Sequence, residues 1–277
     1  LIDTLLVDEA GQIMPHYLSS PLYRSQRAVI VGDIEQLEPV RLLKTNVIEE
    51  IPTIAEEYHE EICVQRNSAQ SYIDRNSDIY ERDHHGKRKG LILTEHRRCE
   101  ESIMQFSNKH VYGGILTIVS PNNNDKLFGN NLIAVDVRGL KNIRTHINMS
   151  EVRVCQRLIE TYIQKYGDDI KKEIGIITPF TKQKDKLQKE IPGVDIGTVH
   201  AFQGQEKKII IFSSVIDNLK QTGIATFIGG STNLLNVALS RAKEQFVLLG
   251  KYGSDFSAPT EPSKERVRNY SGKWSVH

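Results

Sequence analysis

The feature that most constrains the fold is a set of short, unbroken apolar runs, each followed by polar residues or glycine. Unbroken rather than alternating hydrophobicity is typical of strands that are buried on both faces, as in parallel sheets. Helical patterns, with apolar residues three, four and seven positions apart, lie between the later runs. This alternation predicts an α/β fold of three layers with parallel sheets. The runs are 5–7, 28–31, 132–135, 174–177, 209–212 and 246–249, and the helical patterns are 155–162 and 235–242.

Composition narrows the class of protein. Of the 277 residues, 39% are hydrophobic and 26% are charged, which is typical of a globular protein rather than a disordered or fibrous one. No apolar run reaches the roughly 18–20 residues that cross a bilayer, so we expect no membrane partner. The cysteines Cys63, Cys99 and Cys155 are far apart, which excludes a disulfide scaffold and a cysteine-based zinc site. Because the sequence carries no targeting signal, we expect a cytoplasmic protein.

The distribution of polar residues divides the chain into four parts. We expect 1–50 to end a first unit, 51–90 to be a polar insertion or linker, 91–253 to form a second unit, and 254–277 to be a loosely ordered tail. The net charge is only +1, so a nucleic-acid site has to come from a local patch. One basic cluster is either such a patch or a solvated face, and it comprises Arg82, Lys87, Arg88, Lys89, Arg97 and Arg98.

The first motif with catalytic chemistry is the pair Asp8 and Glu9, directly after the run at 5–7. A buried strand that ends in two adjacent carboxylates is the Walker B arrangement of P-loop NTPases. In that arrangement Asp8 holds Mg²⁺ and Glu9 polarises the attacking water. The alternative is an ordinary strand end with a solvated acidic pair, and this motif alone does not decide between them.

A second polar motif, residues 32–40, follows the run at 28–31. It contains Gln36, and a glutamine here can contact the γ-phosphate of ATP, as glutamines orient water in other NTPases. Taken together, the motifs around Asp8 and Gln36 resemble motifs II and III of superfamily 1 helicases.

The resemblance continues through the chain in the motif order of that family. Residues 93–98, with the helix that follows them, resemble motif IV, residues 177–180 with Gln183 motif IVa, residues 197–206 motif V and residues 236–243 motif VI. The chain is most similar to the superfamily 1B branch typified by the nonsense-mediated-decay helicase and its bacterial relatives, over roughly residues 1–250. The resemblance implies a RecA-like P-loop NTPase fold, with a complete second RecA-like domain and a partial first one.

The resemblance also implies roles for particular residues. ATP lies between two RecA-like domains in such helicases, and arginines of the second domain contact its γ-phosphate. Arg98 and Arg241 occupy the matching positions, and Gly204 and Glu206 match positions that contact the nucleotide. The neighbouring Arg97 leaves the register of the first arginine open. Arg241 falls off the apolar stripe of its expected helix, which predicts a side chain that points away from the core.

The implied partner is single-stranded DNA or RNA, which the sequence does not distinguish because backbone contacts dominate in such channels. Residues of motifs IVa and V match segments that contact the strand, namely Thr178, Pro179, Thr198 and His200. Relatives often carry aspartate where this chain has His200, and a hydrogen-bonded loop histidine is the alternative interpretation there. We expect Phe180 and Phe202 to pack in the core.

The sequence contains no G-x-x-x-x-G-K-[ST], the P-loop whose backbone N–H groups and lysine hold the phosphates of ATP. The family carries this motif upstream of motif II. The resemblance therefore implies a further partner, an upstream Walker A-bearing half of the same protein. We expect the isolated chain to be inactive as an ATP hydrolase.

The leading hypothesis is an ATP-dependent helicase or translocase that moves 5′→3′, with ATP and Mg²⁺ as cofactors. One alternative is a non-hydrolysing module that binds nucleic acid or a protein partner. Such a module has no chemical need for its acidic pair, glutamine and arginines, namely Asp8, Glu9, Gln36, Arg98 and Arg241. A metal-dependent nuclease that uses Asp8 and Glu9 is a weaker alternative, since two-metal nucleases need several convergent carboxylates.

Overall fold

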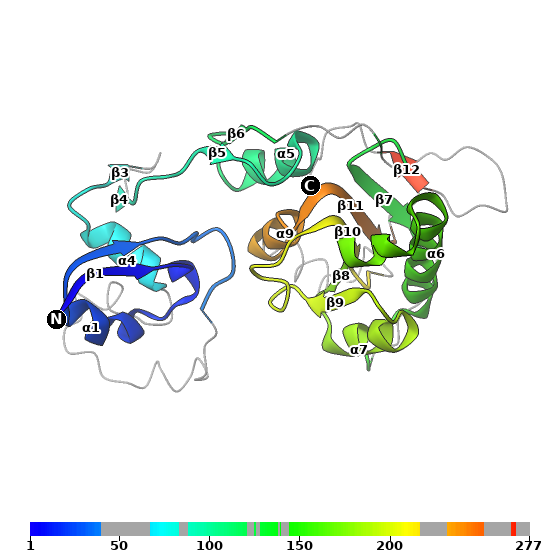
Figure 1. Cartoon of the computed structure of the whole chain (residues 1–277), viewed down its shortest axis with the longest axis horizontal. Helices are drawn as coiled ribbons and strands as arrows, with labels where there is room; N and C mark the ends of the chain where they lie inside the picture. Colours follow the sequence, from blue (N-terminus) through cyan, green and yellow to red (C-terminus); the bar gives the residue numbers. More distant parts are fainter. Residues whose placement is uncertain are drawn as a thin grey trace. The chain divides into compact units, whose positions relative to one another are not determined.

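The computed structural model describes residues 1–39, 67–82, 88–120, 125, 128–137, 139, 144–216, 232–251 and 267–269. The chain divides into two compact units, Leu1–Leu93 and Thr94–His277 (Figure 1). The described residues 67–82 and 88–90, which belong to the stretch expected to be a polar insertion or linker, fall within the first unit. In the described part of the chain, no helix combines the length and the apolar character needed to cross a membrane.

Unit 1 is built on two parallel strands, β1 and β2, joined by a helical crossover. A small core forms where Val7 at the end of β1 packs with Ala10, Leu18 and Ala69. The elements are β1 (Ile2–Val7), η1 (Ala10–Gln12), α1 (Pro15–Tyr23), β2 (Ser25–Ile30), α4 (Ala69–Asn76), β3 (Glu81–Arg82) and β4 (Arg88–Lys89).

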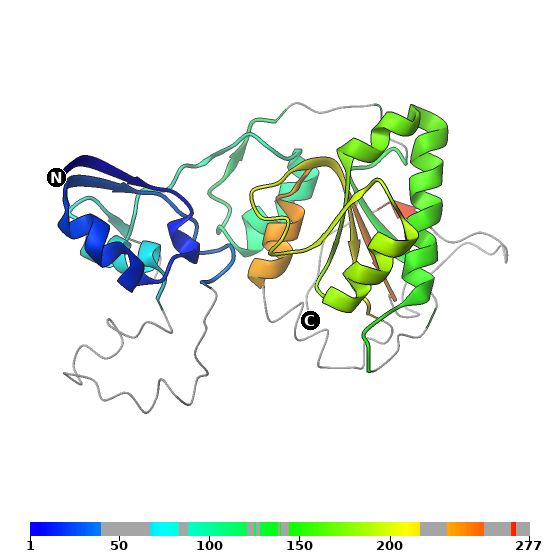
Figure 2. The ribbon, with the colours of Figure 1, turned by 60° about the horizontal axis from the view of Figure 1, so that its bottom comes forward.

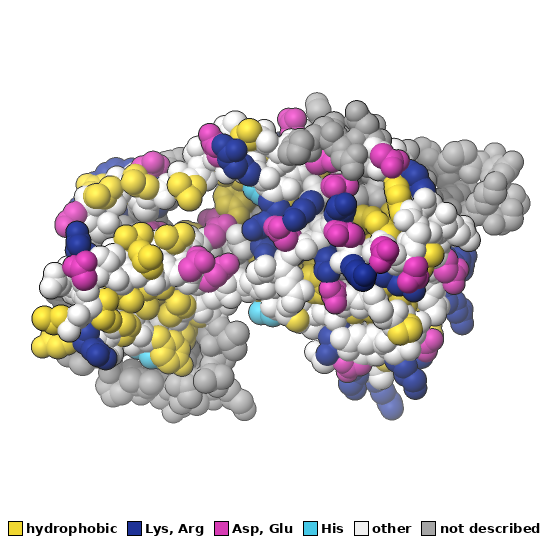
Figure 3. Space-filling model, viewed as in Figure 1, with side chains coloured by type: hydrophobic (Ala, Val, Ile, Leu, Met, Phe, Trp, Pro, Cys, Tyr) yellow, Lys and Arg dark blue, Asp and Glu magenta, His cyan; other side chains and the backbone are white. Residues whose placement is uncertain are grey.

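The prediction that every apolar run is buried on both faces is wrong for β1 and β2. Leu6 is 73% exposed and Val29 is 50% exposed, while Leu5 and Val7 face the small core. The physical reason is that side chains alternate between the two faces of a strand, and the described residues of α1 and α4 pack only on the face of Leu5 and Val7. Hydrophobic side chains accordingly gather on the surface of this unit (Figure 3).

The helix α4 belongs to unit 1, although it lies in the segment expected to be an insertion or linker. Ser68 caps its first turn in a capping box with Ser71, which satisfies backbone N–H groups that a helix start leaves free. Ala69 is 1% exposed, and its N–H donates to the carbonyl of Ile13 at 2.6 Å. The rest of the expected insertion, at 51–66 and 83–87, lies outside the described residues.

Unit 2 contains a six-stranded sheet in the order β12-β7-β11-β10-β8-β9. All neighbours pair in parallel except β12, which pairs antiparallel with β7 and comes from the segment expected to be a loose tail. The elements are β5 (Glu95–His96), α5 (Glu101–His110), β6 (Thr117–Ile118), β7 (Leu132–Asp136), α6 (Met149–Tyr166), η3 (Asp168–Glu173), β8 (Ile174–Thr178), α7 (Thr181–Glu190), β9 (Asp195–Thr198), β10 (Lys207–Ser213), α9 (Thr232–Leu239), β11 (Ala242–Gly250) and β12 (Val267–Asn269).

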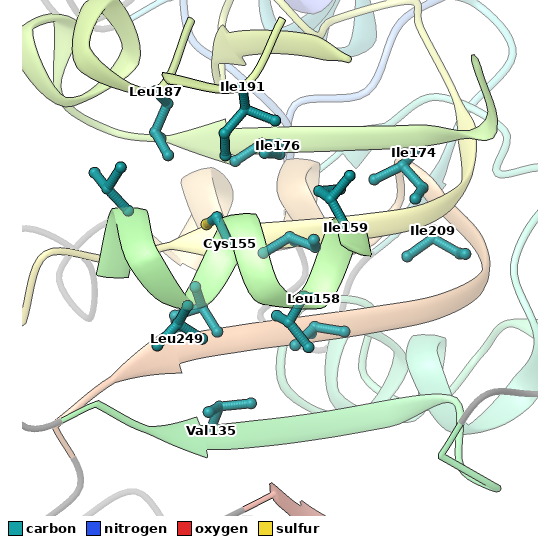
Figure 4. Close-up of a cluster of buried hydrophobic side chains, with 14 of the residues drawn as sticks. Val135, Cys155, Leu158, Ile159, Ile174, Ile176, Leu187, Ile191, Ile209 and Leu249 are labelled. Atoms are coloured by element: carbon teal, nitrogen blue, oxygen red, sulfur yellow. The ribbon is translucent and has the colours of Figure 1, made fainter. Parts of the chain in front are cut away.

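The sheet of unit 2 is covered on both faces. Helices α6 and α7 lie on one face, and α5 and α9 lie on the other (Figure 2). On the α6 side, Cys155 and Ile159 pack against Ile176, Ile209 and neighbouring strand residues to form the main core (Figure 4). The predicted α/β fold of three layers with a parallel sheet is therefore confirmed.

The register of the parallel strands defines two opposite edges of this sheet. At the carboxyl edge, β8 ends at Thr178 beside Thr198, the last residue of β9, and β10 ends at Ser213. At the amino edge, Lys207 of β10 pairs with Ala242 of β11. Because β10 has seven residues, the two edges are about 20 Å apart.

Candidate functional site

In unit 1 the loops that follow β1 and β2 lie against each other. The N–H of Ala10 donates to the carbonyl of Val31 at 2.9 Å. A Cβ at Gly11 would lie 2.4 Å from the carbonyl oxygen of Asp33, and one at Gly32 would lie 2.5 Å from the nitrogen of Gly11. This contact therefore requires glycine at both positions, and it brings the two motifs at 8–9 and 32–36 together.

These loops carry the predicted catalytic residues of unit 1. Asp8 and Glu9 are both exposed, and Asp8 Oδ1 accepts a hydrogen bond from the N–H of Glu9 at 2.8 Å. Glu9 is in the left-handed region at φ 55° and accepts from Gln12 through Oε2 at 2.8 Å. The side-chain amide of Gln36 donates to Asp33 Oδ2 at 2.9 Å. The two carboxylates thus lie on the loop after β1, and the glutamine lies on the neighbouring loop after β2.

The donor set of this site suits Mg²⁺ only in part. Carboxylate oxygens are the ligands that Mg²⁺ prefers, and Asp8 and Glu9 offer them at the surface. Among the described residues no group of three or more His, Cys, Asp or Glu could hold a metal alone. Mg²⁺ usually keeps several waters and shares its remaining positions with substrate phosphates, so a pair of carboxylates is sufficient for that kind of site.

Sequence reasoning missed Gln70, which α4 places against the same loops. Its Oε1 is buried, has no hydrogen-bond partner among the described residues, and lies 3.0 Å from the Cβ position of Gly32. Its side-chain amide donates to Asp74 Oδ1 at 2.6 Å, and burial raises the pKa of Asp74. Only the capping pattern at Ser68 could have indicated a helix here.

In unit 2 a charged cluster forms at the amino edge of the sheet. Arg98 Nε lies 2.6 Å from Glu206 Oε2, and Lys243 Nζ lies 2.5 Å from Glu206 Oε1. The hydrogen bond from Lys243, together with the attraction of Arg98, holds the pKa of Glu206 below its ordinary value. Arg97 instead pairs with Glu95, so Arg98 rather than Arg97 contributes to this cluster.

Arg241 lies close to this cluster but is buried, with 3% of its surface exposed. Its Nε donates to the carbonyl of Val237 at 3.2 Å and its Nη2 donates to Ser240 Oγ at 2.9 Å. The prediction that this side chain points away from the core is wrong. The reason is that α9 ends at Leu239, so Arg241 lies in the turn to β11 and folds back onto the last turn of the helix.

The thiol of Cys99 marks where these side chains converge. Burial raises its pKa to about 12, and the charges of Arg98, Arg241, Glu206 and Lys243 all act on it. The geometry agrees, because Arg98 and Lys243 both pair with Glu206, and the thiol of Cys99 lies 3.6 Å from the carbonyl oxygen of Ser240, next to Arg241. These residues come from motifs far apart in the sequence. Around Glu206 itself two cationic groups meet one carboxylate, and such a local imbalance attracts an anion.

The turn between β9 and β10 delivers Glu206 to this cluster. Phe202 is 2% exposed, and its ring lies 2.6 Å from the Cβ position of Gly175, which confirms the predicted core packing of Phe202. Gly204 is exposed and adopts φ 75°, a conformation that residues with a Cβ rarely adopt. Phe180 differs from its prediction, because it is only half-buried and stacks on His146 with the ring centroids 4.8 Å apart.

The residues predicted to contact nucleic acid lie at the carboxyl edge, away from the charged cluster. His200 is exposed, whereas Pro179 and Thr198 are half-buried. Thr178 is 0% exposed, and its hydroxyl has no partner among the described residues. Its side chain is therefore closed to a ligand in this structure, and Thr198 Oγ1 already accepts from the N–H of Ala201 at 3.4 Å.

The basic cluster of the sequence analysis is divided between the two units. Arg82 and Arg88 are both exposed and flank the ring of Tyr80 in unit 1, whereas Arg97 and Arg98 belong to unit 2. Lys87 lies outside the described residues.

Comparison with known proteins identifies the class. The family model of the AAA domain, AAA_12, matches residues 74–253, and the chain belongs to this family. Helicase SEN1 of Saccharomyces cerevisiae is 27% identical over 278 residues, covering 90% of this chain and 11% of that protein. The uncharacterized ATP-dependent helicase MG140 of Mycoplasma genitalium is 25% identical over 288 residues, covering 95% of this chain and 24% of that protein.

These relatives confirm the resemblance to superfamily 1 helicases. The chain spans 11% and 24% of the lengths of these two curated relatives. Among solved structures, that of the PRRSV helicase matches 89% of this chain and 34% of that chain, with a TM-score of 0.41 and 12% identity.

Proposed function

We propose that this chain is part of an ATP-dependent helicase or translocase that moves 5′→3′ on single-stranded nucleic acid. One observation carries the proposal: Arg98 and Lys243 each form an ion pair with Glu206 at the amino edge of the sheet, and Arg241 lies close by. An arginine directed at a transferring phosphoryl group stabilises the charge that develops on it, and this is worth about 10³–10⁵ in rate.

We assign the nucleotide-binding chemistry of unit 1 to its apposed loops. Asp8 would hold Mg²⁺, Glu9 would polarise the attacking water and Gln36 would sense the γ-phosphate. This assignment is supported by the exposure of both carboxylates and by the contact between their loop and that of Gln36. Mg²⁺, when bound, supplies positive charge that neutralises the phosphates.

The P-loop has to come from elsewhere, because these 277 residues contain no G-x-x-x-x-G-K-[ST]. We assign it to an upstream Walker A-bearing half of the same protein. This half would also cover the exposed face of β1 and β2, where Leu6 and Val29 are 73% and 50% exposed. Parallel sheets are normally buried on both faces, which supports a covering segment here. The 277 residues alone would then hydrolyse no ATP.

Single-stranded nucleic acid would bind at the carboxyl edge, next to Pro179, Thr198 and His200. Loops at the carboxyl ends of parallel strands are the usual place for ligands in open α/β sheets. Exposed His200 suits a phosphate contact through its imidazole. Because Thr178 is buried, its contribution would be to the shape of the turn rather than a direct contact.

The burial of Arg241 favours one alternative, a binding module that does not hydrolyse ATP. A guanidinium that is 3% exposed and bonded to Val237 and Ser240 acts structurally unless it is rearranged. Arg98, in contrast, is exposed in its pair with Glu206, so a ligand can reach it. For this reason we rank hydrolysis first.

The test is ATP turnover by the full-length protein with and without single-stranded DNA or RNA, compared with the 277 residues alone. We expect a strand to stimulate turnover by the full-length protein, and we expect no turnover by the short chain. Strand binding without any ATP hydrolysis by the full-length protein would favour the binding module. Hydrolysis by the 277 residues alone would contradict the assignment of the P-loop to another segment.

A further inference from the structure

A network of fully buried polar side chains lies beneath the carboxyl edge of unit 2. Glu151, in the first turn of α6, is at its centre. Its Oε2 accepts from Ser213 Oγ at 2.6 Å and from the backbone N–H of Val215 at 3.0 Å. Gln183 of α7 donates to Ser213 Oγ at 2.9 Å and accepts from the N–H of Asn148 at 3.0 Å. All five residues are 0% exposed.

The polarity of this network requires a carboxylate at position 151. Asn148 Oδ1 caps α6 by accepting from the N–H groups of Ser150 and Glu151. Its Nδ2 is therefore fixed as a donor, and it donates to Glu151 Oε1 at 3.3 Å. Each oxygen of Glu151 thus faces a donor. A glutamine at this position would turn an N–H toward one of these donors.

Glu151 also holds a strained piece of backbone. Val215 has φ 60°, in the left-handed region that a β-branched residue rarely adopts. Its N–H is bonded to the carboxylate, which ties the strained residue to α6. Strained backbone persists only where the surrounding structure determines it, and it is concentrated at functional sites.

The network adjoins the turns at which we place the nucleic acid. Ser213 and Thr178 end neighbouring strands, and Gln183 lies in the helix that follows Thr178 and Pro179. A buried carboxylate is a costly way to stabilise a core, because an apolar residue of similar volume packs without the desolvation penalty. The charge at Glu151 is therefore better explained by the geometry that it fixes.

We propose that Glu151 is a positioning residue that preforms this edge for the phosphodiester backbone of a single strand. Its carboxylate fixes the backbone at 213–215 and acts through Ser213 and Gln183 on the turn that contains Pro179. The inference rests on the proposed function for the identity of the ligand. The inference adds Glu151 to the proposed strand-binding site as a residue that contacts neither the nucleotide nor the strand itself.

The test uses the full-length protein, with ATP turnover measured against the concentration of an oligo(dT) strand. In Glu151→Gln, the strand concentration for half-maximal stimulation should rise about tenfold, while maximal turnover changes by less than about twofold. Glu160→Gln is the matched control, because Glu160 is on the same helix but exposed, and it should behave like wild type. A general loss of structure would lower maximal turnover as well.

A half-maximal concentration in Glu151→Gln equal to that of Glu160→Gln would overturn the inference while leaving the proposed function intact. Absence of strand stimulation in the wild type would instead contradict the proposed function. If thermal unfolding shows that Glu151→Gln is not folded, Ser213→Ala replaces it in the test. That variant keeps the carboxylate bonded to Val215 and should raise the half-maximal concentration about threefold, whereas no rise would overturn the inference.

Discussion

Glu206 holds two cations at once, and this determines what the charged cluster can bind. Arg98 and Lys243 occupy different oxygens of its carboxylate, so two cationic groups surround one anionic group. The hydrogen bond from Lys243 lowers the pKa of Glu206, which keeps the carboxylate ionised and both partners in place. Under the proposed function, an incoming polyphosphate would therefore have to compete with Glu206 for Arg98.

The first residue-scale prediction concerns His96, next to the cluster. His96 Nε2 accepts from the N–H of Cys99 at 2.9 Å, which requires this nitrogen to be unprotonated. Burial, together with repulsion from Arg98, lowers the pKa of His96 from its ordinary 6.5. Below pH 6.5 the unfolded chain takes up a proton that the folded chain resists. His96 therefore leaves stability intact above that pH and reduces it as the pH falls through the lowered pKa.

We expect His96→Gln to lose less stability than wild type between about pH 8 and about pH 5. Urea unfolding midpoints at the two pH values measure this difference. His200→Gln, which removes an exposed histidine, serves as the control. It should lose as much folding stability at acid pH as the wild type does. If His96→Gln loses as much stability at acid pH as the wild type, the lowered pKa of His96 does not cause that loss.

At the scale of elements, the sequence predicted β7, β8, β10 and β11 within a few residues, because strands that are covered on both faces are continuously hydrophobic. It did not predict the shorter or more polar strands β5, β6, β9 and β12. The same pattern gave a wrong prediction for β1 and β2, because a run of apolar residues does not show whether other elements cover both faces of the strand. The helix α4 was missed because its sequence is mostly polar. Hydrogen bonds in a capping box, rather than hydrophobic periodicity, define its start.

The first turn of α4 gives an element-scale prediction. Ser68→Ala removes the side-chain acceptor for the N–H of Ser71 and should lower the free energy of unfolding by about 1 kcal/mol. Denaturant unfolding followed by far-UV circular dichroism measures the change. Ser19→Ala, at an exposed position inside α1, should change it by less than about 0.5 kcal/mol. Equal values for the two variants would contradict a folded α4 in unit 1.

At the scale of the whole molecule, residue types and motif order predicted the family, and the structure adds where the candidate residues lie. In unit 2 the charged cluster and the proposed strand-binding turns are at opposite edges of one sheet, about 20 Å apart along β10. Sequence spacing could not reveal this separation, since the turn between β9 and β10 joins the two edges within a few residues. A well-packed parallel sheet is a rigid link between such sites.

The most direct test of the central claim is ATP turnover by the full-length protein carrying Arg98→Ala, with Arg97→Ala as its matched control. Arg98 is preferable to Arg241 because its side chain is 40% exposed, so its removal does not strip hydrogen bonds from a buried turn. We predict that Arg98→Ala lowers strand-stimulated turnover by about 10³-fold or more, with nucleotide binding retained. Arg97→Ala, which removes only the exposed pair with Glu95, should keep near wild-type turnover. Equal turnover in the two variants would contradict the account.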